Sequence, residues 1–183
     1  MKKSLIIVGA GVYGLVAHEI ADSVGEYDAI VFVDDFATVA PNGTPVIGAI
    51  ADLPKLSGRF THAIVALGRP DLRLKTLQAI RVETTLQITS LISPQAFVSP
   101  SARIGEGSVI EPMAVVHTGA VLSEGCLVSA GAVVNHFAYL GKGVHIDCNA
   151  AVAGNTVVPD GTKVKSASLF VGEKLDPAAL FAK

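Results

Sequence analysis

The chain has 183 residues, half of them hydrophobic, and a formal net charge of −2. A chain of this length and apolar content buries one sizeable core or two small ones, so one or two domains are allowed. The acidic and basic residues are scattered without runs, which argues against a nucleic-acid-binding surface and against a polybasic membrane-binding patch. Composition therefore favours small-molecule chemistry.

The first apolar run, Leu5 to Val8, ends at Gly9. It is too short for the hydrophobic region of a signal peptide or for a membrane span, so we expect a cytoplasmic protein. Cys126 and Cys148 have neither a CxxC spacing nor a metal-ligand spacing with histidine. We expect both to be small buried apolar side chains, and we expect no metal site.

Residues 1–88 predict a small Rossmann-like α/β domain, because apolar strands alternate with helical stretches. Residues 5–8 are a predicted buried strand, and residues 15–24 have a helical pattern. Further strands are predicted at residues 30–33 and 63–67, with a helix that begins near Pro70. Ligands of open parallel sheets bind beyond the carboxyl ends of such strands.

The turn after the first strand reads Gly9-Ala10-Gly11-Val12-Tyr13-Gly14, and the second strand ends in Asp34-Asp35. A glycine-rich turn at a helix N-terminus favours an anion. In a complete dinucleotide-binding domain the acidic residue would bind a ribose hydroxyl. About ninety residues supply fewer strands than such a domain usually has, so a smaller nucleotide fits better. The alternative is a tight turn that packs closely and binds nothing.

From Ile92 onward every sixth residue is aliphatic, and the residue two positions before each is small or β-branched. The aliphatic column consists of Ile92, Val98, Ile104, Ile110, Val116, Leu122, Val128, Val134, Leu140, Ile146, Val152, Val158 and Val164. Each six-residue unit is therefore predicted to be one short strand and one tight corner, with both kinds of residue facing inward.

Glycine or asparagine recurs three residues after the column, where a corner favours a positive φ. These residues are Gly107, Gly119, Gly125, Gly131, Gly143, Asn149, Asn155 and Gly161. An antiparallel sheet would not keep a period of six over so many units, so the repeats predict an all-β parallel β-helix. They resemble the repeats of the hexapeptide-repeat acyltransferases, which implies a left-handed β-helix with three units to a coil and association as a homotrimer.

The column ends at Val164, which places the β-helix domain at residues 89–166 and leaves residues 167–183 as a carboxyl-terminal cap or tail. Pro177 to Phe181 favour a short helix. Such a cap would shield the open end of the β-helix.

Four groups of residues together resemble one family over nearly the whole chain: the sugar O-acyltransferases and UDP-amino-sugar N-acetyltransferases of the sialic-acid and bacillosamine pathways. The groups are residues 9–14, residues 31–35, Ala66-Leu67-Gly68 with Arg73, and residues 133–136. The resemblance implies that the α/β domain binds a nucleotide-linked amino sugar, that the β-helix binds acetyl-CoA, and that a histidine of the β-helix is the general base.

His136 matches the catalytic histidine of that family, with Asn135 beside it, and His145 matches a second histidine near the acetyl group. The resemblance implies cofactor binding by His145 and Gly154, and substrate binding by Gly11, Val12, Tyr13, Gly14, Asp34, Asp35, Gly68 and Arg73. A histidine base is chemically suitable, because the attacking amine or hydroxyl must lose a proton and neutral imidazole accepts one near pH 7.

The family usually has Asp or Glu after the catalytic histidine, whereas this chain has Phe137. Another group must then orient the imidazole, and the candidates are Asn135 and a carboxylate of another subunit, such as Glu111 or Asp147. Phe137 also interrupts the glycine and asparagine pattern, which favours a functional corner. His117, one coil before Asn135, is a further candidate residue for the side of the β-helix that carries His136.

The family normally has one or two more coils that bind CoA, so two hypotheses stay open. In the first, the protein is an acetyl-CoA-dependent transferase acting on an amino or hydroxyl group of a nucleotide-linked sugar. In the second, it is a non-catalytic trimeric protein that binds a nucleotide or nucleotide sugar. His145 is predicted to face outward, where it would line an interface if it had no chemical role.

Overall fold

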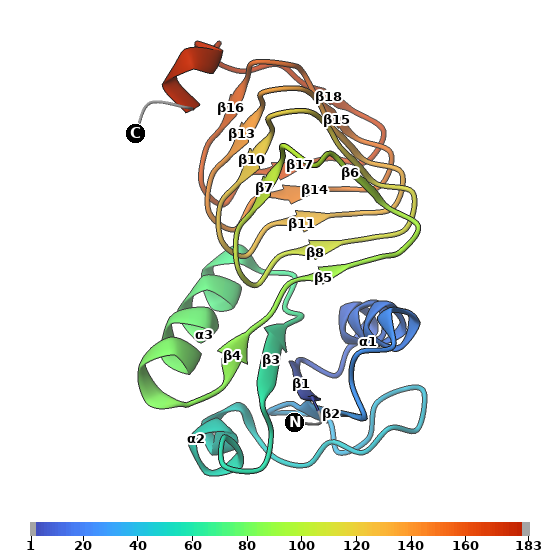
Figure 1. The fold of residues 1–183 in the computed structure, drawn as a ribbon. Coiled ribbons are helices and arrows are strands. Elements are labelled where there is room, and N and C mark those ends of the chain that lie inside the picture. The colour runs from blue at the N-terminus through green and yellow to red at the C-terminus, as the bar shows by residue number, and fades with distance from the viewer. Residues whose placement is uncertain (1–2, 181–183) are drawn as a thin grey trace. The chain divides into compact units, whose positions relative to one another are not determined.

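The computed structural model describes residues 3–180, and the chain divides into two compact units, Met1–Leu91 and Ile92–Lys183 (Figure 1). Each unit has its own hydrophobic core. Within residues 3–180, every helix is too short or too polar to cross a membrane.

The amino-terminal unit is built on a four-stranded parallel sheet with the strand order β2-β1-β3-β4. Its elements in chain order are β1 (Ser4–Val8), α1 (Val12–Val24), β2 (Ala29–Val33), η1 (Ile50–Asp52), α2 (Leu53–Leu56), β3 (His62–Val65), α3 (Pro70–Glu83) and β4 (Gln87–Ile88). Leu5 to Val8 are fully buried, as expected for a central strand of a parallel sheet. Ile6 and Val8 belong to the core cluster that also holds side chains of α2 and α3.

The helix predicted at residues 15–24 begins earlier, at Val12, because Gly11 is its N-cap residue in an extended conformation. It ends at Val24 and is capped by Gly25, whose φ of 69° allows its backbone N–H to reach the carbonyls of Ala21 and Asp22. The glycine-rich turn therefore leads directly from β1 into the first turn of α1.

The second unit is a parallel β-helix of two-residue strands that form three parallel sheets in a repeated arrangement, consistent with a left-handed β-helix (Figure 1). The β5 sheet contains β5 (Leu91–Ile92), β8 (Val109–Ile110), β11 (Leu127–Val128), β14 (His145–Ile146) and β17 (Lys163–Val164). The β6 sheet contains β6 (Phe97–Val98), β9 (Val115–Val116), β12 (Val133–Val134), β15 (Ala151–Val152) and β18 (Leu169–Phe170). The β7 sheet contains β7 (Arg103–Ile104), β10 (Val121–Leu122), β13 (Tyr139–Leu140) and β16 (Val157–Val158).

The predicted inward column is confirmed, because its members from Ile110 to Val164 form one buried cluster together with the small residues between them. The predicted corners are confirmed as well. From Gly107 to Ala167, every sixth residue has a positive φ, and Phe137 is included with a φ of 53°. Phe137 therefore keeps the corner geometry although it interrupts the pattern of glycine and asparagine residues.

Two expectations need correction. Cys126 is buried as predicted, whereas Cys148 is exposed, because it lies two positions after column residue Ile146, in the corner rather than in the inward row. The repeats do not stop at Val164, because β18 pairs with β15 through Leu169 and Phe170.

After β18 the chain turns back. Thr156 and Lys174 form an antiparallel bridge, and the Leu175 N–H donates to the Asn155 carbonyl. The 3-10 helix η2 spans Pro177–Leu180, and the predicted helix residue Phe181 lies outside the described residues.

Candidate functional site

The glycine-rich turn is shaped by close packing at one glycine and by open space at another. A Cβ on Gly14 would collide with the carbonyl oxygen of Gly9, so the contact between α1 and the turn requires glycine there. A Cβ on Gly11 would meet nothing within 4 Å. Gly11 and Val12 are exposed at the start of α1, and within the described residues no side chain caps this helix. The turn is therefore closely packed at Gly14 and also leaves the N-terminus of α1 accessible to a ligand.

Asp34 is used to build the loop after β2. One carboxylate oxygen accepts the Ala10 N–H at 2.8 Å, and the other accepts the N–H groups of Phe36 and Ala37 at 2.8 and 2.9 Å. Burial by itself would raise the pKa of Asp34, but these three hydrogen bonds outweigh it and hold the pKa below its ordinary value. Asp34 therefore ties the end of β2 to the glycine-rich turn.

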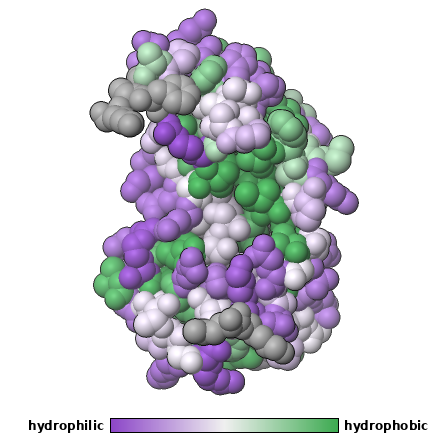
Figure 2. Space-filling model, in the orientation of Figure 1, coloured by the Kyte–Doolittle hydropathy of each residue, from purple (hydrophilic) through white to green (hydrophobic). Residues whose placement is uncertain are grey.

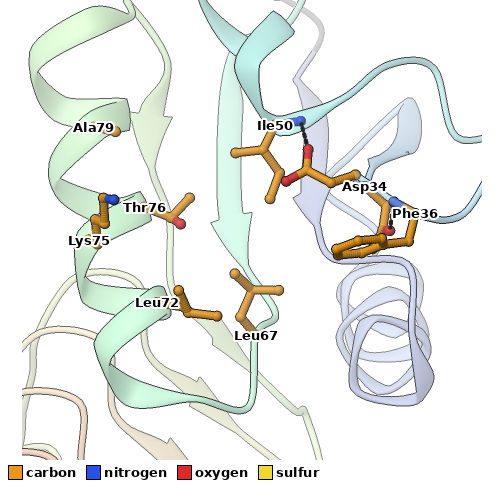
Figure 3. A pocket seen from close by; sticks show the side chains of 9 residues that line it. Asp34, Phe36, Ile50, Leu67, Leu72, Lys75, Thr76 and Ala79 are labelled. Carbon is orange, nitrogen blue, oxygen red and sulfur yellow. Dashed lines mark hydrogen bonds between the residues drawn. The ribbon is translucent and has the colours of Figure 1, made fainter.

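Asp35 is more exposed and accepts one hydrogen bond, from the Ile50 N–H at 2.9 Å. Both aspartates border a cavity of about 330 Å³ beyond the ends of β2 and β3. Figure 3 shows residues of α3 facing Ile50, Leu67 and the loop after β2 across this cavity. Its lining consists of Asp34, Asp35, Phe36, Ile50, Leu67, Leu72, Lys75, Thr76 and Ala79.

Of the predicted substrate-binding residues, only Asp34 and Asp35 line this cavity. The sequence reasoning missed Phe36, which is 97% exposed, and Lys75. The position of Phe36 directly after the aspartates was a signal that could have been used. Nothing in the sequence distinguished Lys75 from other polar residues of a helix surface.

Gly68 and Arg73 are brought together in a different way. Arg73 is fully buried, and its guanidinium donates to the carbonyls of Leu67 and Gly68 at 2.6 and 3.0 Å. It thereby shapes the exposed turn after β3. A ligand at this turn would meet the backbone that Arg73 holds more readily than the guanidinium itself.

His136 lies in a stack of turns between the β6 and β7 sheets that we name the histidine corner, residues 99–102, 117–120, 135–138 and 153–156. Its side chain is exposed. The Asn135 side-chain oxygen accepts the His136 backbone N–H at 2.8 Å and lies 2.7 Å from His136 Nδ1. Because a backbone N–H can only donate, the atom facing it must be the amide oxygen, and Nδ1 must then carry a proton. In the neutral ring the lone pair is left on Nε2.

Gly154, one coil further on, leaves room for that nitrogen, since a Cβ at this position would lie 2.6 Å from His136 Nε2. On the other side, the Phe137 ring occupies the space above Gly119 and meets the His136 ring edge-on at a centroid distance of 6.2 Å. A left-handed conformation at a non-glycine residue is unfavourable by about 1–2 kcal/mol, so Phe137 stores strain beside His136.

His145 is not on the histidine corner. It lies on β14 in the β5 sheet, and β13 with the corner 141–144 separates it from His136 along the chain. Its Nε2 lies 3.0 Å from Ser129 Oγ and 3.9 Å from Asp147, and although it points outward, its side chain is only 13% exposed. Within one chain the two predicted histidines are therefore apart.

The carboxylates considered as partners of His136 lie on another stack of turns, between the β5 and β6 sheets. Glu111 accepts the Ala130 N–H at 3.0 Å, and Asp147 pairs with Lys163 at 3.0 Å. Burial alone would raise the pKa of Asp147, but the hydrogen bonds from Lys163 and from the Cys148 N–H hold it below its ordinary value. Of the three candidates for orienting His136, Asn135 is the one that hydrogen-bonds to it within the same chain. Residues 3–180 contain no group of three or more His, Cys, Asp or Glu side chains placed to hold a metal ion.

The contacts of Asp34 predict a pH-dependent contribution to stability. A carboxylate with a lowered folded-state pKa stabilises the folded chain fully above its ordinary pKa of 3.8 and ceases to do so as the pH falls through the lower value. Asp34→Asn should reduce the free energy of unfolding by about 1–3 kcal/mol at pH 7, because charge-assisted hydrogen bonds are lost. Urea unfolding followed by tyrosine fluorescence would measure this, and the difference should shrink below pH 3.8.

The exposed Asp28→Asn is the matched control and should change stability by less than about 0.5 kcal/mol. If the loss of unfolding free energy in Asp34→Asn became larger toward acid pH, the assignment of these hydrogen bonds to the ionised carboxylate would be contradicted.

Comparison with known proteins adds independent information. Residues 4–80 match the family model of the PglD N-terminal domain. The acetyltransferase domain of PglB from Neisseria gonorrhoeae is 30% identical over 96% of this chain and 95% of that chain, with a TM-score of 0.75. The same domain in complex with acetyl coenzyme A is 29% identical over 97% and 95% of the two chains, with a TM-score of 0.71.

PerB from Caulobacter crescentus, solved with CoA and GDP-perosamine, shares the fold with a TM-score of 0.77 at 23% identity, over 94% of this chain and 91% of that chain. A search of the curated proteins found no match. The match to the PglD N-terminal domain and the similarity to PglB over both units show that the chain belongs to the family that its motifs resemble, the sugar O-acyltransferases and UDP-amino-sugar N-acetyltransferases with a hexapeptide-repeat β-helix.

Proposed function

We propose that the protein transfers an acetyl group from acetyl-CoA to an amino or hydroxyl group of a nucleotide-linked sugar. The observation that carries the proposal is the geometry of His136, whose proton is held on Nδ1 by Asn135 and whose Nε2 faces the space that Gly154 leaves open. The similarity over both units to the acetyltransferase domain of PglB supports the same reaction class.

In this proposal the acceptor amine or hydroxyl forms a bond to the acetyl carbonyl carbon, the C–S bond of the thioester breaks and CoA leaves as its thiolate, and His136 Nε2 accepts the proton that the acceptor loses. Asn135 keeps the ring in the required tautomer and orientation, which is the positioning role of the third residue in other base-assisted sites. Asn135 is neutral, so it orients the imidazole without adding a negative charge next to it.

Acetyl-CoA, when bound, supplies an activated thioester carbonyl. On the donor side we assign Gly154 and His145, as the resemblance implies, and the complex of the PglB domain with acetyl coenzyme A supports a donor site in this fold. Gly154 fits the role because it has no side chain that would cover His136 Nε2.

The nucleotide part of the acceptor is assigned to the cavity of the amino-terminal unit. Asp35 offers a carboxylate to hydroxyl or N–H donors, Lys75 offers a positive charge, and the exposed ring of Phe36 offers a flat apolar surface. The open space at Gly11 and the start of α1 would suit a phosphate group.

We also propose that the active form is a homotrimer. His136 and His145 lie on different parts of the coil, so they would act in one site only if neighbouring copies supplied one each. The outward side of the β6 sheet is apolar along all five strands and consists of Phe97, Val115, Val133, Ala151 and Leu169. Figure 2 shows hydrophobic residues gathered on the side of the β-helix that faces the viewer.

Sedimentation equilibrium should therefore give a mass three times the 18.8 kDa of one chain. Val133→Glu should lower that mass, because it places a charge in the middle of the apolar strip. A monomer at micromolar concentration in the unmodified protein would contradict the shared site.

The base assignment is tested by acetyl transfer to a panel of nucleotide-linked amino sugars that includes GDP-perosamine. His136→Ala should lower kcat by about 10²–10⁴-fold, the usual contribution of a general base, with an unchanged thermal unfolding curve. Asn135→Ala should give a smaller loss, because the imidazole remains but is free to rotate. The control is Lys142→Ala, an exposed residue on another corner.

If His136→Ala kept more than a tenth of the activity, His136 would not be the base. If the unmodified protein acetylated no member of the panel while nucleotide sugars still raised its melting temperature, the non-catalytic binding protein would be the better description.

Gly154→Ala tests the access to His136 Nε2. The backbone at Gly154 has no positive φ, so alanine is tolerated locally, but its methyl group would lie 2.6 Å from the nitrogen and displace the ring. A displacement of about 1 Å should reduce kcat by about 100-fold. Gly58→Ala is the matched control, since a Cβ there meets nothing within 4 Å. Equal activity of the two variants would show that Nε2 does not need this space.

A further inference from the structure

A second imidazole lies directly beside the proposed base. His117 occupies the histidine corner one coil before His136, and the two rings meet edge to face at a centroid distance of 6.2 Å and an angle of 74°. Both side chains are exposed. Two titratable rings thus share one accessible wall of the β-helix.

The hydrogen bonds assign opposite roles to the two rings. The Thr118 N–H donates to His117 Nδ1 at 2.9 Å, so this nitrogen must be an unprotonated acceptor. Neutral His117 therefore carries its proton on Nε2, whereas neutral His136 carries its proton on Nδ1. The outer nitrogen of His117 is a donor, and the outer nitrogen of His136 is an acceptor.

The repeat itself does not require an imidazole at this place. The equivalent corner positions in the preceding and following coils are Ser99, Asn135 and Ala153, which differ in size and polarity. Because His117 is exposed and lies outside the inward column, its ring adds nothing to the buried core of the β-helix. Contact with a ligand therefore explains the histidine at position 117 better than packing does.

We propose that His117 binds the acceptor sugar by donating its Nε2–H to an oxygen next to the group that His136 deprotonates. This inference rests on the proposed acetyl transfer. The Nε2–H group of His117 cannot usefully bind an attacking amine, because the amine nitrogen has one lone pair and needs it to attack the thioester. Sugars carry hydroxyl oxygens on neighbouring carbons, so a base and a donor side by side match a reacting group and its neighbour. His117 would thus select acceptors with an adjacent oxygen.

The first test needs no substrate. Nitrogen-15 NMR of the full protein, labelled at histidine, reports which ring nitrogen of each neutral imidazole carries the proton, and His117→Phe and His136→Ala assign the signals. The expected result is the Nε2–H form for His117 and the Nδ1–H form for His136. A neutral His117 in the Nδ1–H form would overturn the inference, because no donor would then face the acceptor, while leaving the base assignment intact.

The second test uses steady-state kinetics with the acceptor that the panel identifies. His117→Phe should lower kcat/KM for the acceptor about tenfold, the usual effect of losing one hydrogen bond, with an unchanged KM for acetyl-CoA and unchanged thermal unfolding. His117→Gln should recover most of this loss, because the glutamine amide is again a donor. Thr118→Val, an exposed neighbour whose backbone N–H is kept, is the control.

An acceptor that lacks the adjacent hydroxyl should react equally with the unmodified protein and with His117→Phe. A loss of equal size on both acceptors, or no loss on either, would overturn the inference. Absence of transfer to every acceptor would instead contradict the proposed function, so the two failures can be told apart.

Discussion

The left-handed residue at every sixth position is the constraint on which the rest of the β-helix depends. From Gly107 to Ala167 each corner repeats this backbone conformation, so all corners turn by the same amount and the strands of successive coils pair in register. Residues three units apart then become neighbours. Met113 and Phe137 adopt the conformation although a side chain disfavours it, which shows that the coil imposes the geometry on its residues.

This stacking also places some corner side chains at the surface, and His117 and His136 are two exposed examples. On the histidine corner two adjacent columns bring His117, His136 and Gly154 together from three successive coils. Each contributes something different: a donor nitrogen, an acceptor nitrogen and an absence of side chain. Asn135 completes the arrangement by fixing a tautomer through a neutral amide. A carboxylate in its place would also stabilise the protonated imidazole by its charge. In this chain the His136 imidazole is therefore oriented by Asn135 without that charge.

The amino-terminal unit divides its polar residues in a comparable way. Asp34 and Arg73 are used by the protein itself, since Asp34 accepts three backbone N–H groups and Arg73 donates to two backbone carbonyls. Asp35 and Phe36 lie next to Asp34 but remain accessible at the cavity. The residues that shape the loops and those available to a ligand are therefore neighbours in sequence with different tasks.

The period of six and the glycine or asparagine that recurs three residues after the column were sufficient to predict the parallel β-helix, its inward column and its corners, because strand alternation and positive φ leave a direct mark on residue type. The end of the repeats was misjudged, since Leu169 and Phe170 extend the β6 sheet by backbone pairing after the aliphatic column has ended. The motifs also identified His136 and Asn135 as neighbours in the chain.

Only the tertiary structure decided which nitrogen of each histidine is available, that Gly154 leaves space for one of them, and that His145 lies on another sheet. The same holds for Asp34 and Asp35, which are identical residues with different partners. The tautomers of His117 and His136 depend on hydrogen bonds to adjacent residues, whose side-chain orientation leaves no mark on the repeat pattern. The space at Gly154 and the different partners of Asp34 and Asp35 depend on contacts between residues far apart in the sequence, which composition and spacing do not reveal.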